Sequence, residues 1–199
     1  MLGRYNLGVS REGRMQVVKF SPVEIRLKNG ELLLIREGTA DDAAQVIAYI
    51  EGIAGESDFL TFGPGEFGLT VEGERSYLAG ISARGNALYL VAVIDGEIVG
   101  TLSFAGGGRP RTAHTGEFGV SVRRSHWGNG IGRELIRCLL NWCKESGRIR
   151  KVNLRVRTDN LRAINLYKQM GFQEEGRITR DFQVDGVFYD SLAMGYPID

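Results

Sequence analysis

Residues 117–133 read EFGVSVRRSHWGNGIGR. Apolar and polar residues alternate in the first part of this stretch, which predicts a strand over residues 115–122. Gly128, Gly130 and Gly132 then follow at every second position, ahead of an amphipathic helical pattern. Glycine turns tightly because it has no Cβ, and the first N–H groups of a helix point outward without acceptors at the positive end of the dipole. We therefore expect a strand–turn–helix unit that can bind a phosphate or diphosphate.

The spacing of these glycines differs from two common nucleotide-binding motifs. In the dinucleotide fingerprint the third glycine comes one residue later, and an acidic residue ends the next strand, where this chain has Val156 and Arg157. A P-loop needs a Lys-Ser/Thr pair after its last glycine, and none follows here. Arg123, Arg124 and Arg133 flank the turn and can add charge-assisted contacts to an anion. A turn that only packs the helix on the strand is the alternative.

A second informative stretch, residues 160–172, reads NLRAINLYKQMGF. It predicts a helix in which Asn160 and Tyr167 lie two turns apart on one face, with Ala163 and Ile164 between them. A small residue at Ala163 allows a ligand or another chain to approach closely. The alternative role of Asn160 is to cap the helix, which is compatible with ligand binding. The alternative for Tyr167 is a structural tyrosine of the core with a satisfied hydroxyl.

Local patterns predict the other elements. Asn29-Gly30, Asp95-Gly96 and Asp185-Gly186, each between apolar runs, predict three hairpins. Residues 52–70 are glycine-rich and predict a long loop of a kind that is often functional, or a short helix. The expected helices cover residues 40–51, 71–82, 130–144 and 160–169, and the expected strands cover 23–27, 32–36, 89–94, 98–104, 115–122, 152–156, 178–184 and 187–194. Because hairpins coexist with strand–helix–strand crossovers, we expect an α/β fold with a mixed sheet.

Composition limits the class of protein. The chain has 199 residues, 43% of them hydrophobic and 25% charged, which excludes wholesale disorder and suits one domain over residues 21–199 after an N-terminal arm, residues 1–20. No run of about 18 apolar residues predicts a membrane span, and the N-terminus lacks the apolar core of a signal peptide. Cys138 and Cys143 cannot build a disulfide scaffold, so a reducing, cytoplasmic location is expected. The Cys and His residues do not have the spacing of a zinc site, so no metal site is expected.

Charge is distributed unevenly along the chain. Residues 1–100 carry 9 Lys/Arg and 14 Asp/Glu, whereas residues 101–180 carry 16 and 6. The net charge is only +1, so the basic segment indicates a local polyanion site rather than general nucleic-acid binding. A solvated arginine-rich face is the alternative.

Taken together, residues 117–133 and 160–172 resemble the GNAT superfamily of acetyl-CoA-dependent N-acetyltransferases, and the resemblance extends over about residues 31–196. The family's phosphate-loop pattern is Gln/Arg-x-x-Gly-x-Gly/Ala, which this chain fills with Trp127 in place of the usual first residue. Its second signature, Asn-x-x-Ala-Ile-x-x-Tyr-x-x-x-Gly-Phe, is filled completely. Trp127 and residues 185–194 are similar to the bacterial branch that acetylates ribosomal-protein N-termini and polyamines.

The resemblance implies a mostly antiparallel central sheet flanked by helices, with two central strands that splay apart where the cosubstrate acetyl-CoA enters. It implies that strand backbone groups meet the acetyl-pantetheine arm, that the turn and arginines bind the diphosphate, and that one helix lines the other wall. A free N–H near Val120 would stabilise the oxyanion. The implied cofactor-binding residues are Val120, Val122, Arg123, Arg124, Gly128, Asn129, Gly130, Ile131, Gly132, Arg133, Asn160 and Ala163.

Acetyl transfer to an amine requires a base and an acid. An acceptor amine with a pKa of about 10.4 must lose a proton before it attacks, and Glu117 is the candidate general base, directly or through a water. Alternation places Glu117 and Val120 on opposite faces of their strand, so we expect a bulge there, as the family commonly has, to re-aim them. Tyr167 is the candidate general acid for the leaving thiolate. An ordinary solvent-facing carboxylate is the alternative for Glu117.

The expected acceptor is an amine of a small molecule or of a protein N-terminus. By resemblance the acidic N-terminal half builds much of the acceptor side, which would favour a cationic amine. Residues 56–62 combine acidic and aromatic side chains suited to such an amine, although Phe59 and Phe62 can equally anchor a loop. A non-catalytic acyl-CoA-binding sensor is the alternative function. A homodimer is expected because the final hairpin often lies at dimer contacts in such proteins.

Overall fold

One eight-stranded sheet runs through the computed structural model, which describes residues 18–199. The strand order is β1-β2-β3-β4-β5-β6-β8-β7, and all neighbours are antiparallel except β5 and β6. The strands are β1 (Val23–Arg26), β2 (Leu32–Glu37), β3 (Ala87–Ile94), β4 (Glu97–Gly106), β5 (Thr115–Val122), β6 (Lys151–Arg157), β7 (Gln173–Val184) and β8 (Val187–Pro197). The predicted mixed sheet is confirmed, and the three predicted hairpins are β1–β2, β3–β4 and β7–β8. Most of the predicted arm, residues 1–17, lies outside the described residues.

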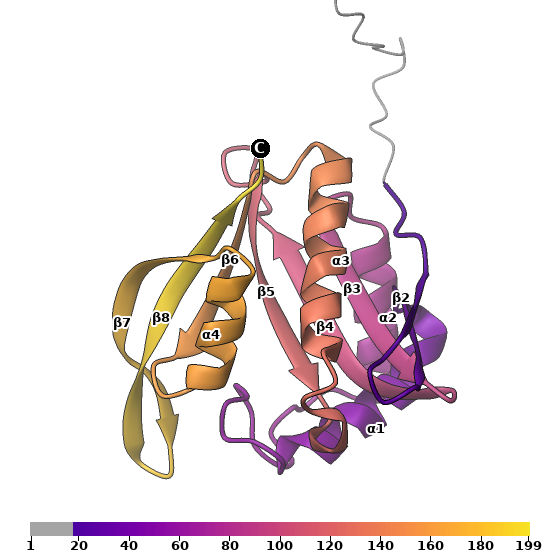
Figure 1. The fold of residues 1–199 in the computed structure, drawn as a ribbon, viewed down its shortest axis with the longest axis horizontal. Coiled ribbons are helices and arrows are strands. Elements are labelled where there is room, and N and C mark those ends of the chain that lie inside the picture. The colour runs from indigo at the N-terminus through magenta and orange to yellow at the C-terminus, as the bar shows by residue number, and fades with distance from the viewer. Residues whose placement is uncertain (1–17) are drawn as a thin grey trace, which may run out of the picture.

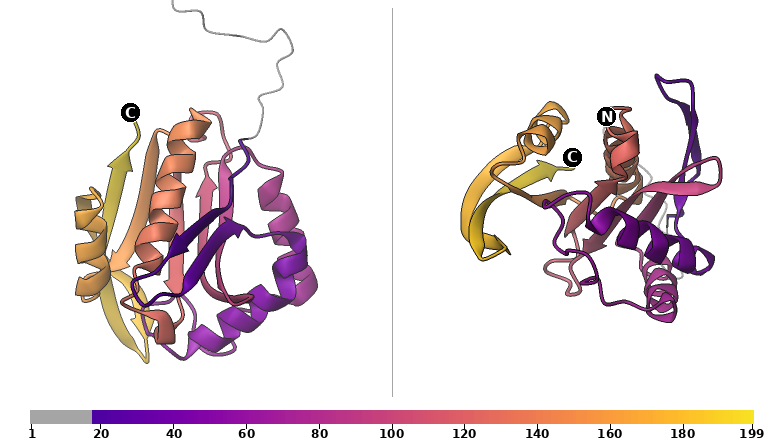
Figure 2. Two further views of the ribbon diagram at one scale, coloured as in Figure 1. Left: turned by 45° about the vertical axis from the view of Figure 1, so that its right-hand side comes forward. Right: turned by 90° about the horizontal axis from the view of Figure 1, so that it is seen from below.

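Four α-helices within residues 18–199 cover the two faces of the sheet. Helices α1 (Ala43–Ala54) and α2 (Val71–Ser82) pack on one face, and α3 (Ile131–Ser146) and α4 (Leu161–Gln169) pack on the other. In Figure 1, α3 and α4 lie in front of the sheet and α2 lies behind it, and Figure 2 shows these layers from below. The segment between α1 and α2, residues 55–70, is the predicted loop, although residues 52–54 of the expected range extend α1 instead. None of the helices described is both long and apolar enough to cross a membrane.

Helix α3 forms because its apolar residues recur on one face. Leu135 and Leu139 lie four residues apart and are fully buried, and burial of each such side chain contributes about 1.5–3 kcal/mol. The helix ends at Gly147, whose φ of 60° lies in the left-handed region. The indole N–H of Trp142 donates to the Val18 carbonyl oxygen at 3.0 Å, so the start of the described chain lies against this helix.

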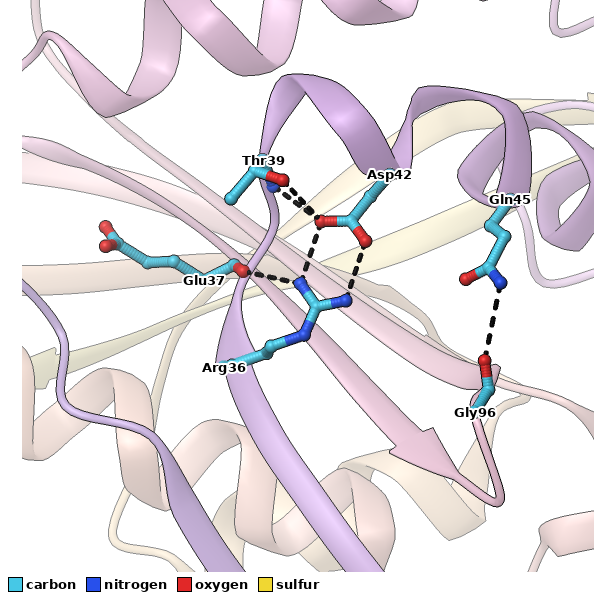
Figure 3. A network of polar contacts seen from close by, with 6 residues as sticks. All are labelled: Arg36, Glu37, Thr39, Asp42, Gln45 and Gly96. Carbon is cyan, nitrogen blue, oxygen red and sulfur yellow. Dashed lines mark hydrogen bonds and ion pairs between the residues drawn. The ribbon is translucent and has the colours of Figure 1, made fainter.

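A largely buried carboxylate fixes the approach to α1 (Figure 3). Asp42 accepts a hydrogen bond from the Thr39 backbone N–H at 2.7 Å, as in a capping box, and pairs with Arg36 at 2.7 and 2.8 Å. Burial raises the pKa of Asp42, but the hydrogen bonds from Arg36 and Thr39 outweigh it and hold the pKa below its usual value. Gln45 donates to the Gly96 carbonyl oxygen, which links α1 to the β3–β4 turn.

Strands β5 and β6 separate along their length. Their parallel pairing covers only the segments 115–117 and 151–153, although β5 continues to Val122 and β6 to Arg157. Beyond Glu117, the edge of β5 that faces β6 therefore has no strand partner among the residues that the structure describes. This is the splay that the family resemblance implied.

The prediction of a bulge within β5 is wrong. This strand pairs with β4 in unbroken register from Gly116 to Val122. The nearest register shift lies between β3 and β4, at Ala92–Val93. Loss of the β6 partner, rather than an extra residue in β5, frees the backbone groups of β5.

Candidate active site

The glycine turn leaves a run of backbone donors without acceptors in the described structure. Gly128 and Gly130 have φ values of 89° and 88°, in the left-handed region, and Gly130 is the N-cap of α3. Within the described part of the chain, no backbone carbonyl accepts a bond from the N–H groups of residues 128–133, and the first bond of the helix runs from the Glu134 N–H to the Gly130 carbonyl at 3.1 Å. This run of donors lies at the positive end of the α3 dipole, an arrangement that fits an anion.

Two arginines and a tryptophan stand beside the turn. The guanidinium carbons of Arg124 and Arg162 lie 6.0 and 5.3 Å from the centroid of the Trp127 ring. The Trp127 indole N–H donates to the Val122 carbonyl oxygen at 2.6 Å, which fixes the ring against the end of β5. Arg162 belongs to α4, and sequence reasoning missed it because only the fold brings it to the turn.

Arg123 is the one predicted diphosphate ligand whose side chain lies elsewhere. Its guanidinium lies over the Tyr49 ring of α1, 5.9 Å from the centroid. Strand alternation explains this placement, because Arg123 shares the face of Ser121, whose hydroxyl bonds the Tyr49 hydroxyl at 3.0 Å. Arg133, by contrast, lies in the first turn of α3 and donates to a side chain of α4 at 2.5 Å. The structure thus brings Arg124 and Arg133 to the turn but directs Arg123 toward α1.

Small and apolar residues line the junction of β5, α3 and α4. Val120 and Val122 of β5 and Ala163 of α4 are half-buried at the margin of the core. Gly132 lies in the first turn of α3 rather than in the bend, and a Cβ built there would lie 3.8 Å from Val122. Asn160 caps α4 by accepting from the Ala163 N–H at 3.2 Å. Val120, Val122 and Ala163, which the resemblance implied as cosubstrate-binding residues, therefore border the same core cluster, and Gly132 lies next to Val122.

Glu117 lies where β5 and β6 part, on the face that α1 and α2 cover. Its side chain is 49% exposed, and its Oε1 accepts from Arg155 of β6 at 3.1 Å. Arg155 also contacts Asp181 of β7 at 3.4 Å. A register shift between Ile178 and Phe182 interrupts the β7–β8 ladder at Asp181. Exposed pairs contribute at most about 1 kcal/mol, so the contact orients the Glu117 carboxylate without locking it.

Tyr167 lies on the opposite face of the sheet, in a cluster of aromatic rings. It is 8% exposed, and its ring meets Phe118 and Phe172 edge-on at 6.0 and 5.9 Å between centroids. Burial raises the pKa of Tyr167 to about 12, so the hydroxyl keeps its proton at neutral pH. Because Phe118 follows Glu117 in β5, the two candidate catalytic residues flank the same part of the strand from opposite faces.

The sequence and the fold of this site match a known family. The model of the acetyltransferase (GNAT) family matches residues 56–172, more than half of the chain. The chain belongs to this family. The matched span includes Glu117, the glycine turn and the second signature, so the family resemblance recognised from those motifs is confirmed.

Two curated relatives of the family align over part of their length. L-amino acid N-acetyltransferase AaaT of Escherichia coli (strain K12) is 37% identical over 106 residues, which is 53% of this chain and 65% of that protein. Spermidine N(1)-acetyltransferase of Vibrio cholerae is 32% identical over 78 residues, which is 39% of this chain and 45% of that protein. The chain therefore spans less than two thirds of either relative.

Two solved structures share the fold over most of this chain. The acetyltransferase of the GNAT family from Streptococcus pneumoniae is 31% identical with a TM-score of 0.82, covering 84% of this chain and 99% of that one. The yncA protein of Salmonella typhimurium, solved with its cofactor acetyl-CoA, has a TM-score of 0.74 and covers 84% of this chain and 94% of that one. At 19% identity, the second likeness concerns the fold alone.

Proposed function

We propose that this protein transfers an acetyl group from acetyl-CoA to an amine of a small molecule or of a protein N-terminus. The observation that carries the proposal is the set of N–H groups of residues 128–133 that have no acceptor within residues 18–199, at the end of a strand that has separated from its neighbour. A diphosphate fits these donors because they converge at a helix N-terminus. The adjacent unpaired edge of β5 suits an extended arm with amide groups.

The chain's own residues divide the binding of the cosubstrate between them. The N–H groups of residues 128–133 would hold the diphosphate, and Arg124 and Arg133 would add charge. Backbone groups near Val120 would face the pantetheine arm. The Val122 carbonyl oxygen already accepts a hydrogen bond from the Trp127 indole N–H. Val122 would therefore contribute by its place beside the arm and not as a free acceptor.

Glu117 and Tyr167 would move protons on opposite sides of the transfer. Glu117 would accept the amine proton, directly or through a water, while Arg155 orients the carboxylate. Tyr167 would donate a hydrogen bond to the sulfur of the leaving thiolate, because its raised pKa keeps it protonated. Glu117 and Tyr167 lie on opposite faces of the sheet, and the amine and the thioester would meet in the gap between β5 and β6.

The acceptor that best suits the charges is a cationic amine. Glu117 and Asp181 share one arginine, Arg155, so these three side chains together carry a net negative charge that favours a cation beside Glu117. The loop residues expected to receive the amine have other contacts: Glu56 accepts from the Arg124 N–H at 2.6 Å, and Phe59 packs over a guanidinium. The preference for a cation is therefore assigned to the surroundings of Glu117.

Two measurements test the proposal. Calorimetry with acetyl-CoA should show binding, and a thioester-consumption assay with a panel of amino acids, polyamines, aminoglycosides and N-terminal peptides should show turnover of at least one amine. Binding with no turnover of any amine would favour the non-catalytic sensor instead. Absence of acetyl-CoA binding would contradict both functions.

A further inference from the structure

We infer that Arg157 is a positioning residue for this transfer, holding the loop of residues 56–59 across the open ends of β5 and β6. These residues are called the bridging loop below. The inference rests on the proposed function, because the gap between the two strands matters only if an amine and a thioester meet in it. Neither a motif nor the family resemblance singled out Arg157.

The bridging loop contacts the carboxyl ends of both separated strands. At one end, the Glu56 carboxylate accepts from the backbone N–H of Arg124, just beyond β5, at 2.6 Å. At the other, the Asp58 carbonyl oxygen accepts from Nη1 of Arg157, the last residue of β6, at 2.8 Å. In Figure 1 the purple segment after α1 lies at the lower edge of the molecule, below the arrowheads of β5 and β6. The loop therefore spans the end at which the strands are no longer paired.

Arg157 is almost completely enclosed. Its side chain is only 5% exposed, and a buried guanidinium requires partners for its donors. Nε and Nη2 donate to the two carboxylate oxygens of Asp159 at 3.1 and 2.7 Å, a bidentate pair that fixes the plane of the guanidinium. This geometry leaves Nη1 directed at the loop carbonyl.

Two aromatic rings add contacts to the same guanidinium. Its carbon lies 3.7 Å from the centroid of Tyr189 in β8 and 4.9 Å from that of Phe59 in the bridging loop. Arg157 thus joins the loop, the end of β6 and the β7–β8 hairpin. Lysine could keep the charge but not the fork, because an ammonium has no planar donor array.

The functional consequence concerns the acceptor more than acetyl-CoA. The diphosphate donors belong to residues 128–133, away from Arg157 in the chain, whereas the bridging loop borders the same gap as Glu117. If the loop is loosened, binding of the amine must order more conformations and therefore costs more entropy. This cost raises the KM for the amine and lowers the fraction of encounters that are productive. Arg157 would therefore set acceptor affinity by limiting the motion of the bridging loop.

The test compares variants at both ends of the loop with a matched control. Arg157→Met keeps much of the aliphatic stem and removes the fork, Arg157→Lys keeps the charge, and Glu56→Gln weakens the opposite contact without altering the enclosed site. Arg150→Met is the control, because Arg150 is exposed and takes part through its backbone. For each variant we would measure hydrogen exchange of residues 56–59, the acetyl-CoA dissociation constant, and KM and kcat for the best amine of the panel.

We expect faster exchange in the bridging loop and at least a ten-fold higher acceptor KM in Arg157→Met. Acetyl-CoA affinity and kcat should change much less. Arg157→Lys should recover only part of the loss, and Glu56→Gln should change KM in the same direction, which keeps the inference testable if Arg157→Met does not fold. Unchanged acceptor KM in a variant whose loop exchanges faster would overturn the inference alone. A wild-type protein that acetylates no amine would instead overturn the proposed function, and the inference with it.

Discussion

Replacing Tyr167 by phenylalanine removes one hydroxyl and keeps the aromatic packing. The pKa of Tyr167 is raised to about 12 by burial, whereas a free thiol has a pKa of about 8.5. Complete proton transfer from the tyrosine to the thiolate would therefore be uphill by about 5 kcal/mol. A buried site also raises the pKa of the thiol, which narrows this gap. Tyr167 should act mainly by donating a hydrogen bond to the developing thiolate.

The expected loss follows from the strength of such a bond. A hydrogen bond to a charged group contributes roughly 1.5–3 kcal/mol, which corresponds to about a 10- to 100-fold fall in kcat. The acetyl-CoA dissociation constant should change less, because the donors of residues 128–133 are intact. Since Tyr167 stays protonated well above neutral pH, the loss should be similar from pH 6 to 9.

A thiol-release assay with the best amine measures kcat, and calorimetry measures acetyl-CoA binding. Tyr196→Phe is the matched control, because Tyr196 packs against Phe172 in the same aromatic cluster, with ring centroids 5.4 Å apart. The same melting temperature in both variants would show that packing is preserved. An unchanged kcat in Tyr167→Phe, or an equal loss in both variants, would refute the role of the hydroxyl.

Three further substitutions test other parts of the structure. Glu117→Gln should lower kcat by roughly 100-fold with little effect on acetyl-CoA affinity; a fall of less than a few-fold in the same assay would remove Glu117 as the base. Burial raises the pKa of Glu74, whose carboxylate oxygens have no partner among the described residues, so ionisation opposes folding increasingly as pH rises above about 4.3. Glu74→Gln should therefore be more stable than wild type at pH 7 and equal to it near pH 4 in urea unfolding. Asp42→Asn should do the reverse, because the pKa of Asp42 is lowered: we expect a loss of roughly 1–3 kcal/mol at pH 7 that shrinks as the pH falls through the folded pKa of Asp42, and a pH-independent difference would contradict this.

Local sequence signals account for most of the fold. The turn dipeptides Asn29-Gly30, Asp95-Gly96 and Asp185-Gly186 set the three hairpins because they favour the backbone twist of tight turns. Residues 115–122 form the strand that their alternation predicts, and residues 71–82 form the expected helix. Strand β7 begins at Gln173, earlier than expected. Its first residues are exposed and mostly polar, so the sequence shows no apolar–polar alternation there that would predict a strand.

The candidate site was predicted where it depends on neighbours in the chain and missed where it depends on contacts across the fold. The glycine turn and the α4 cap lie within single motifs. Arg155 and Arg157 differ in role although they are two residues apart, because one meets Glu117 and the other meets the bridging loop and Tyr189. No pattern in one sequence encodes these partners. The direction of Arg123 could have been foreseen, since alternation along β5 places it on the face of Ser121.

A crystal structure of the protein with acetyl-CoA tests the central claim most directly. The diphosphate oxygens should lie within about 2.7–3.2 Å of N–H groups of residues 128–133, with the pantetheine arm between β5 and β6. A diphosphate bound elsewhere, or a glycine turn covered by other protein groups in the complex, would contradict the account.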